Sequence, residues 1–335
     1  MLSRRRVLLT GGAGFIGSHV AEALLRRGDS VFIVDNFNDF YPKSMKESNW
    51  ADIAGTGNSR LFRCDICEER QMVSVFEETR PDVVLHLAGQ PGVRDSIADP
   101  QLYERINAGG TLTVLELSHR FGVGKFIFAS SSSVYGPCAK LPFSEEETCL
   151  LPSSPYALTK LAGERWAALY SRLYQMQTIC LRLFTVFGPR QRPDLAIYKF
   201  LSAMESGQVV PVFGDGTSSR DYTFITDIVA GFIAAIEYES LATTGDNFEV
   251  FNLGSSISTS LLSLIRTIER VTGRTARIEM QPLQAGDMPF TWANISKAES
   301  LLGYKPRTTL EQGITLFVEW LQKSHACKGA YVSTP

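Results

Sequence analysis

Long apolar runs are missing from this chain of 335 residues. No stretch approaches the roughly 20 apolar residues that a membrane-spanning helix needs. Basic residues at 4–6 precede an apolar run, but glycines interrupt that run after residue 10, which leaves it too short for the core of a signal peptide. We therefore expect no membrane segment and a cytoplasmic protein.

A strong charge of one sign is also absent. The 33 Lys and Arg residues nearly balance the 35 Asp and Glu residues, which gives a net charge of -2. Such a composition supplies no general attraction for nucleic acid or for an anionic membrane. We expect neither as a partner, so an anionic substrate would have to be held by local arginines.

Cysteine and histidine are scarce, with six and four residues. The one CxxC pair, Cys64 and Cys67, has no second pair or histidine cluster in the sequence to complete a metal site. We expect free thiols and no metal.

The rest of the composition is that of an ordinary globular chain, with 44% hydrophobic and 20% charged residues. Short apolar runs alternate with stretches of helical periodicity. This alternation predicts an α/β fold of Rossmann type, a doubly wound parallel sheet with a smaller C-terminal α/β lobe. The expected strands are residues 7–10, 31–34, 61–63, 83–86, 125–128, 178–184 and 250–252, and the expected helices are 15–27, 69–78, 102–121 and 155–174.

The domain division follows from the same pattern. We expect residues 1–186 to form the cofactor-binding domain, together with a strand near 248–254 that returns to its sheet. Residues 187–247 and 255–325 would form the substrate lobe, and 326–335 a flexible tail. The sequence contains no internal repeat that would suggest another division.

A glycine-rich turn follows the first expected strand, in the sequence Thr-Gly-Gly-Ala-Gly-Phe-Ile-Gly at 10–17. Glycines between a strand and a helix let the backbone approach a pyrophosphate at the helix N-terminus. Such turns also occur for packing reasons alone. Asp35 strengthens the cofactor interpretation, because an acidic residue about 20 positions further on accepts from the adenosine ribose hydroxyls. A carboxylate there would repel a 2′-phosphate, which favours NAD over NADP unless a distant Lys or Arg intervenes.

Tyr156 and Lys160 are spaced i, i+4 on an expected helix, so that their polar ends share one face. A tyrosine pKa lies near ~10, and both an ammonium group and a positive nicotinamide would favour the phenolate. This spacing is common on ordinary helix surfaces, but the upstream glycine turn favours a catalytic pair. Four serines, 130–133, follow a strand at the carboxyl edge of the sheet, where ligands bind. Their hydroxyls can orient a sugar, although some would satisfy their own turn.

With these residues the chain resembles the extended short-chain dehydrogenases/reductases of the NAD-dependent epimerase/dehydratase family. The shared motifs are TGGAGFIG, HLAG at 86–89, SSSVYG at 131–136 and YALTK at 156–160. The chain is most similar to the UDP-glucuronate 4-epimerases, through residues 35–42, 89–94, 184–194 and 214–222. The resemblance covers nearly the whole chain and implies NAD as the cofactor.

The resemblance also assigns roles to individual positions. It implies that Ser131, Tyr156 and Lys160 are the catalytic hydroxyl, the base and the group that activates the base. The implied cofactor-binding residues are Gly11, Gly14, Phe15, Ile16, Gly17, Asp35, Asn36, Asn38, Asp65, Ile66, Leu87, Ala88, Gly89, Gln90, Asn107, Tyr156, Lys160 and Phe184. The implied substrate-binding residues are Arg94, Ser131, Ser132, Ser133, Tyr156, Thr185, Arg192, Arg220 and Asp287.

Among the substrate residues, Ser132, Ser133, Thr185 and Arg192 would hold a sugar carboxylate, since hydroxyls and a guanidinium can satisfy a desolvated anion. Arg94, Arg220 and Asp287 would contact the diphosphate and the uridine. Two alternatives stay open. Arg192 could be a solvated loop residue, and Arg220 could form an ion pair with Asp221 or Asp215.

The implied reaction is oxidation of the sugar at carbon 4, rotation of the 4-keto sugar and return of the hydride to its other face. Related decarboxylases carry Glu at the position of Ser133, and related dehydratases carry an Asp-Glu pair where this chain has Ser132-Ser133. Three functions remain open: UDP-glucuronate 4-epimerase, UDP-glucose 4-epimerase and a noncatalytic nucleotide sensor.

The resemblance implies a homodimer through helices 102–121 and 155–174.

Overall fold

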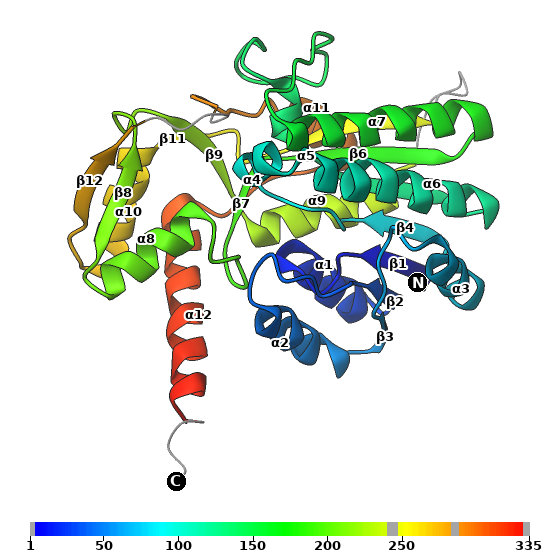
Figure 1. Cartoon of the computed structure of the whole chain (residues 1–335), viewed down its shortest axis with the longest axis horizontal. Coiled ribbons are helices and arrows are strands. Elements are labelled where there is room, and N and C mark those ends of the chain that lie inside the picture. The colour runs from blue at the N-terminus through cyan, green and yellow to red at the C-terminus, as the bar shows by residue number, and fades with distance from the viewer. Residues whose placement is uncertain (1–3, 240–246, 283–287, 331–335) are drawn as a thin grey trace.

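The structure, a computed structural model, describes residues 4–239, 247–282 and 288–330. A central parallel sheet is covered by helices on both faces, and a smaller lobe lies at one end of it (Figure 1). This is the α/β, doubly wound class that the sequence predicted.

The large sheet has seven strands in the order β10-β6-β5-β4-β1-β2-β3, and every pairing is parallel. Apolar residues fill both of its faces, which is why the strands read as short continuous apolar runs in the sequence. The late strand β10 pairs with β6 along its whole length. The strands are β1 (Arg6–Thr10), β2 (Ser30–Val34), β3 (Asn58–Phe62), β4 (Val83–His86), β5 (Lys125–Ser131), β6 (Gln177–Leu183) and β10 (Phe248–Leu253).

One face of this sheet is covered by α1 (Phe15–Arg27), α2 (Lys43–Ala54) and α9 (Ile225–Glu237), and the other by α3 (Glu69–Thr79), α6 (Gly110–Arg120) and α7 (Pro155–Tyr174) (Figure 1). Helix α7 begins where the Ser154 side chain accepts from the Ala157 amide and Pro155 occupies the first turn.

The predicted helix 102–121 is a composite. It consists of α5 (Pro100–Tyr103), a π-helical turn (Glu104–Gly109) and α6, and α4 (Val93–Ala98) precedes it. The wider turn brings Asn107 inward, where it is buried and bonded to the loop after β4.

The smaller lobe contains a three-stranded sheet of β7 (Thr185–Phe187), β9 (Ser219–Phe224) and β11 (Ser258–Ser260), and a parallel pair of β8 (Val209–Phe213) and β12 (Arg277–Gln281). Its helices are α8 (Ala196–Glu205), α10 (Leu261–Thr272) and α12 (Leu310–Ala330), whereas α11 (Ser296–Leu302) packs against β10 and α9 of the large sheet. Helix α12 continues to Ala330, and the expectation of a flexible tail from residue 326 stays a prediction. No proline interrupts the chain there, so each added residue extends the helical hydrogen bonding. Residues 331–335 lie outside the described residues.

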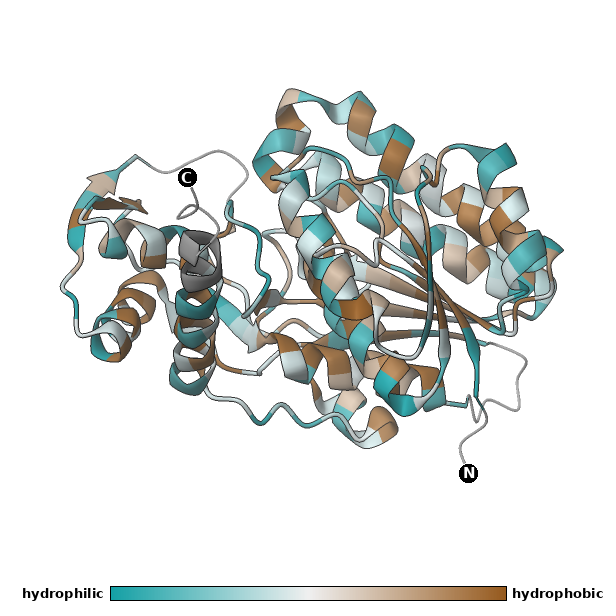
Figure 2. Ribbon diagram, turned by 90° about the horizontal axis from the view of Figure 1, so that it is seen from below, coloured by the Kyte–Doolittle hydropathy of each residue, from teal (hydrophilic) through white to brown (hydrophobic). Residues whose placement is uncertain are grey.

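The hydropathy of the elements agrees with this layering. In Figure 2 the strands of the central sheet are largely brown, whereas the helices around it alternate between brown and teal. Each of these helices therefore has an apolar stripe to place against the sheet. No helix in the described part of the chain is both long enough and apolar enough to cross a membrane.

Candidate active site

A cavity of about 1600 Å³ lies between the carboxyl edge of the large sheet and the smaller lobe. Cavities that bind one drug-sized ligand measure roughly 300–1,000 Å³, so this one has room for two large ligands together. Its wall includes both the glycine turn and residues of the lobe such as Phe213.

Most of the residues predicted from the sequence meet in this wall. They are Gly11, Gly14, Phe15, Ile16, Gly17, Asp35, Asn36, Asn38, Asp65, Ile66, Leu87, Ala88, Gly89, Gln90, Arg94, Ser131, Ser132, Ser133, Tyr156, Lys160, Phe184, Thr185, Arg192 and Arg220. Asn107 does not line the cavity. Its side chain accepts from the Gln90 amide at 2.6 Å and donates to the Gln90 carbonyl at 3.0 Å, and so fixes the loop after β4 that lines the cavity. Asp287 lies outside the described residues.

The glycine turn fits a dinucleotide. At Gly11, φ is +70°, and an added Cβ would lie 2.7 Å from the Ala88 amide nitrogen. At Gly17, an added Cβ would collide with the Gly11 carbonyl. The first turn of α1 carries no acidic residue, and at the N-cap residue, Gly14, no side chain caps the helix. The helix N-terminus is therefore able to receive a negatively charged group such as a pyrophosphate.

Asp35 is fixed at the end of β2. Its carboxylate accepts from the amides of Ala13 (3.2 Å) and Phe37 (2.9 Å), and the Lys46 ammonium lies 3.6 Å away. Lys46, which comes from α2, is a distant cation of the kind that the sequence analysis left open when it favoured NAD over NADP. Asn36 donates to Asp65 at 3.0 Å, which joins the ends of β2 and β3 beside the cavity.

A buried histidine organises the next loop. His86 contacts the hydroxyls of Thr10 (2.7 Å) and Thr111 (3.0 Å), and the Ala88 amide donates to the same Thr10 oxygen at 3.1 Å. Burial lowers the pKa of His86 to about 3, with a smaller contribution from the charge of Lys160. His86 is thus a neutral link that fixes residues 87–89 against the cavity.

Tyr156, Lys160 and Ser131 come together at the middle of the carboxyl edge. Burial raises the pKa of Tyr156, while a hydrogen bond with Ser131 and the charge of Arg192 oppose this rise. Burial lowers the pKa of Lys160 to about 8, and its ammonium donates to the Ala129 carbonyl at 2.9 Å. Ser131 and Arg192 are therefore the groups that favour the phenolate in this structure, and the activating role of Lys160 stays a prediction.

A buried ion pair supports this helix from below. Glu164, four residues after Lys160, accepts two parallel hydrogen bonds from Arg182 on β6, at 2.9 and 2.8 Å. Both side chains are 4% exposed. The Ser130 hydroxyl donates to Glu164 at 2.5 Å, so the pair also holds the end of β5. Sequence reasoning missed this pair, although the regular spacing of Tyr156, Lys160 and Glu164 on one helix face was a usable signal.

The comparisons agree with this geometry. The profile of the protein family described as GDP-mannose 4,6 dehydratase matches residues 8–317. Over 318 residues the chain is 38% identical to the UDP-glucuronate 4-epimerase of Thermodesulfobacterium geofontis, covering 95% of this chain and 96% of that protein. The chain belongs to the NAD-dependent epimerase/dehydratase family.

Solved structures of the family show the same architecture. The UDP-glucuronic acid 4-epimerase from Bacillus cereus, in complex with UDP-glucuronic acid and NAD, has a TM-score of 0.88 and 35% identity, covering 95% of this chain and 99% of that chain. The UDP-glucose 4-epimerase from Thermotoga maritima, with UDP-glucose, has a TM-score of 0.87 and 33% identity over the same shares. Overall similarity therefore does not distinguish an enzyme for acidic sugars from one for neutral sugars. Individual side chains in the site have to make that distinction.

Arg192 is the residue predicted from the sequence to hold a sugar carboxylate. It is 17% exposed, lines the cavity and lies 5.5 Å above the Phe40 ring. Its Nε and one terminal nitrogen donate to the Asp194 carboxylate, each at 2.9 Å. Arg192 is therefore not a solvated loop residue, and Asp194 fixes the plane of its guanidinium.

The serines at the end of β5 divide into two roles. The Ser131 hydroxyl accepts from the amide of Ser133 at 3.2 Å and from its hydroxyl at 2.9 Å, and residues 132–135 form a 3-10 turn. This turn holds Ser131 in the cavity wall with Tyr156, whose pKa Ser131 helps to lower. Ser130 instead bonds Glu164.

Arg94 and Arg220 lie on the lobe side of the cavity. Arg94 lies 4.9 Å above the Phe213 ring, and Arg220 donates to the Ser219 carbonyl at 2.9 Å. The Asp221 carboxylate is buried and accepts from Ser255, Ser256 and Ala293, so its role is to join three segments of the lobe.

Proposed function

We propose that this protein interconverts UDP-glucuronate and UDP-galacturonate by inversion at sugar carbon 4, with NAD as its cofactor. The observation that carries the proposal is the position of Arg192, which lines the same cavity as Tyr156 and Ser131 and acts on the Tyr156 pKa. A fixed cation at the reacting end of the cavity matches a sugar that carries a carboxylate there.

The chain offers a complete cofactor site for this chemistry. The glycine turn and the α1 N-terminus would receive the pyrophosphate, and Asp35 would accept from the adenosine ribose. When bound, NAD takes up a hydride from carbon 4 and returns it. The domain division of the sequence analysis is part of the proposal, with the cofactor on the large sheet and the UDP-sugar against the lobe.

The acid-base work falls to Tyr156. Its phenolate removes the proton of the 4-hydroxyl as the hydride leaves carbon 4, and its phenol returns that proton when the hydride comes back to the opposite face of the ring. Ser131 orients the hydroxyl through its hydrogen bond with Tyr156, and the charge of Arg192 favours the phenolate. Each turnover ends with no net oxidation.

The carboxylate needs restraint, because a 4-keto uronate is a β-keto acid that can lose carbon dioxide. Ser132, Ser133 and Thr185 offer hydroxyls in the cavity wall, and Arg192 offers a charge of fixed orientation. A well-paired carboxylate keeps its electrons on oxygen, so this pocket would favour epimerisation over decarboxylation.

A second candidate is epimerisation of neutral UDP-glucose or UDP-galactose. The observation that favours it is the two-pronged hydrogen bonding of Arg192 to Asp194, which already occupies one edge of the guanidinium. The noncatalytic sensor has less support, since Ser131, Tyr156 and Lys160 all lie in the cavity wall.

The test is proton NMR of UDP-glucuronate incubated with purified protein without added NAD, beside a UDP-glucose reaction. Formation of UDP-galacturonate, absent with Tyr156→Phe, is the expected result. Turnover of UDP-glucose alone would overturn the carboxylate role of Arg192. Release of a UDP-pentose would show that the serine pocket does not restrain the carboxylate.

The proposal includes a homodimer formed through α6 and α7. The supporting observation is that α7 exposes large apolar side chains, with Leu158 56% and Leu173 60% exposed. Light scattering of a Leu158→Glu, Leu173→Glu variant should show monomers where the parent shows dimers. An unchanged mass would remove this interface.

A cytoplasmic location is also part of the proposal. Its support is that the cysteines in the described part of the chain, Cys64, Cys67, Cys138, Cys149 and Cys180, are free thiols.

A further inference from the structure

One buried hydroxyl faces the cavity and is not used by the acid-base chemistry. Tyr41 is 8% exposed, and its hydroxyl has no hydrogen-bond partner among the described residues. Buried hydroxyls are normally paired, because leaving one unpaired is costly. The Tyr41 side chain lines the cavity, so a ligand there can reach it.

The position of this hydroxyl indicates which part of a ligand it meets. A Cβ added to Gly14, the residue that precedes α1, would lie 3.8 Å from the Tyr41 oxygen. The hydroxyl thus lies over the helix N-terminus that would receive a pyrophosphate. Burial and the charge of Asp35 raise the pKa of Tyr41, and the charge of Arg192 opposes this rise, so both residues lie near enough to act on the hydroxyl.

A cation lies over the ring of the same tyrosine. The Lys46 ammonium lies 5.2 Å from the centre of the Tyr41 ring and donates to Asn38 at 2.7 Å. Asn49, on the same helix as Lys46, donates to the Ala13 carbonyl at 3.0 Å, so α2 is anchored directly on the glycine turn. Positive charge and a hydroxyl donor are therefore held rigidly next to the α1 N-terminus.

We propose that the Tyr41 hydroxyl donates a hydrogen bond to the pyrophosphate of the bound dinucleotide, with Lys46 supplying positive charge beside it. This inference rests on the proposed NAD cofactor. It makes α2 the third side of the pyrophosphate site, opposite the glycine turn and α1. A phenol O–H is a donor to phosphate oxygens, and such charge-assisted bonds are stronger than neutral ones.

The test compares nucleotide affinities of Tyr41→Phe and the parent after dialysis to remove bound nucleotide. Calorimetry should show that NAD and ADP-ribose, which both contain the pyrophosphate, bind about tenfold more weakly to Tyr41→Phe, while ligand-observed NMR shows unchanged adenosine binding. The melting temperature of the nucleotide-free variant should not fall, because the hydroxyl has no protein partner to lose.

The matched control is Tyr304→Phe, in which the lost hydroxyl is buried but donates to the Gly254 carbonyl at 3.0 Å. It should lower the melting temperature and leave nucleotide affinity unchanged. The inference would be overturned if Tyr41→Phe bound NAD and ADP-ribose as tightly as the parent does. It would also be overturned if adenosine lost as much affinity as they do, or if NAD alone lost affinity. Absence of NAD binding by the parent would instead count against the proposed function.

Discussion

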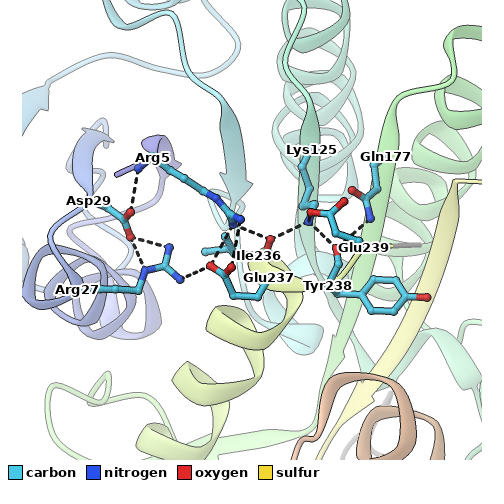
Figure 3. A network of polar contacts seen from close by, with 9 residues as sticks. All are labelled: Arg5, Arg27, Asp29, Lys125, Gln177, Ile236, Glu237, Tyr238 and Glu239. Atoms are coloured by element: carbon cyan, nitrogen blue, oxygen red, sulfur yellow. Dashed lines mark hydrogen bonds and ion pairs between the residues drawn. The ribbon is translucent and has the colours of Figure 1, made fainter. Parts of the chain in front are cut away.

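The two ends of the large sheet each bury a lysine, and the two lysines are equally hidden. Lys125, at the amino edge, is 5% exposed, and Lys160, at the carboxyl edge, is 6% exposed. Lys125 donates to the carbonyls of Ile236 (2.7 Å) and Tyr238 (2.5 Å) and lies 3.3 Å from the Glu239 carboxylate (Figure 3). Lys160 donates to the Ala129 carbonyl and faces the cavity.

The amino edge has a structural task. Arg5 also donates to the Ile236 carbonyl, at 2.7 Å, and Arg27 forms an ion pair with Glu237 (Figure 3). Cations thus gather where α9 ends, where the negative end of the helix dipole stabilises them. Burial lowers the pKa of both lysines, but the Glu239 carboxylate opposes this at Lys125, whereas the pKa of Lys160 falls to about 8. The two equally buried lysines therefore differ in their surroundings, with the carbonyls at the end of α9 around Lys125 and the cavity beside Lys160.

The largest effect is expected from Tyr156→Phe at the carboxyl edge. Loss of the proton acceptor should lower kcat by about 10²–10⁴-fold. The melting temperature should stay near that of the parent, since the ring that packs against Tyr103 remains. NMR turnover assays and thermal unfolding measure the two quantities. A rate within tenfold of the parent would show that another group accepts the proton.

Glu164→Gln should give the next largest effect, on the free energy of unfolding. Removing one charge of a buried, hydrogen-bonded pair costs about 3–5 kcal/mol, because Arg182 stays buried without its partner. The matched control is Glu311→Gln, which breaks the exposed pair with Arg270 and should cost less than about 1 kcal/mol. Urea unfolding compares them, and equal losses would mean that the Glu164 pair is open to water.

The pH dependence of stability sharpens the comparison further. Lys160 has a pKa of about 8 in the folded protein against 10.5 in the unfolded chain. Between these values the unfolded chain binds more protons, so stability rises by about 3 kcal/mol as the pH increases from 8 to 10.5, and below pH 8 this contribution no longer changes. Urea unfolding of the parent and of Lys160→Met from pH 7 to 10.5 tests this. Parallel curves would show that Lys160 does not titrate in the window.

The sequence predicted the parallel sheet and the catalytic pair for physical reasons. Strands that are buried on both faces are continuous apolar runs, and a helix that begins with Ser154 and Pro155 marks its own start. The glycine turn required little inference, because its spacing reflects a backbone that must approach a ligand closely.

The missed contacts join elements that are distant in the sequence. Arg182 meets Glu164 because β6 passes beneath α7, and Lys46 meets Asp35 because α2 folds back over the glycine turn. Helix periodicity can place Glu164 on the same face as Tyr156 and Lys160, but no local signal identifies the partner that a distant element supplies. The π-helical turn was also unpredictable, since it arises where Asn107 turns inward to bond the Gln90 backbone.

The smallest effect is expected from Lys125→Met at the amino edge. The Ile236 carbonyl would keep its bond from Arg5, and the Tyr238 carbonyl would keep one from Gln177 at 3.1 Å, so neither carbonyl loses its only partner, and the Glu239 carboxylate is exposed to water. The expected loss is about 1–2 kcal/mol, from the charge at the end of α9. Turnover should not change, and Lys160→Met should give the converse, lost turnover without lost stability.

The two variants distinguish the roles of the two edges only if Lys125→Met changes the free energy of unfolding and Lys160→Met changes turnover. Urea unfolding and NMR turnover of both proteins provide that comparison. Because the two lysines are equally buried, a stability loss shared by both would reflect burial alone, and a turnover loss in Lys125→Met would mean that β5 transmits strain from Lys125 to Ser131 along its length. A loss of stability in Lys125→Met alone would show that the partners of a buried lysine, and not its depth, decide what it does for the fold.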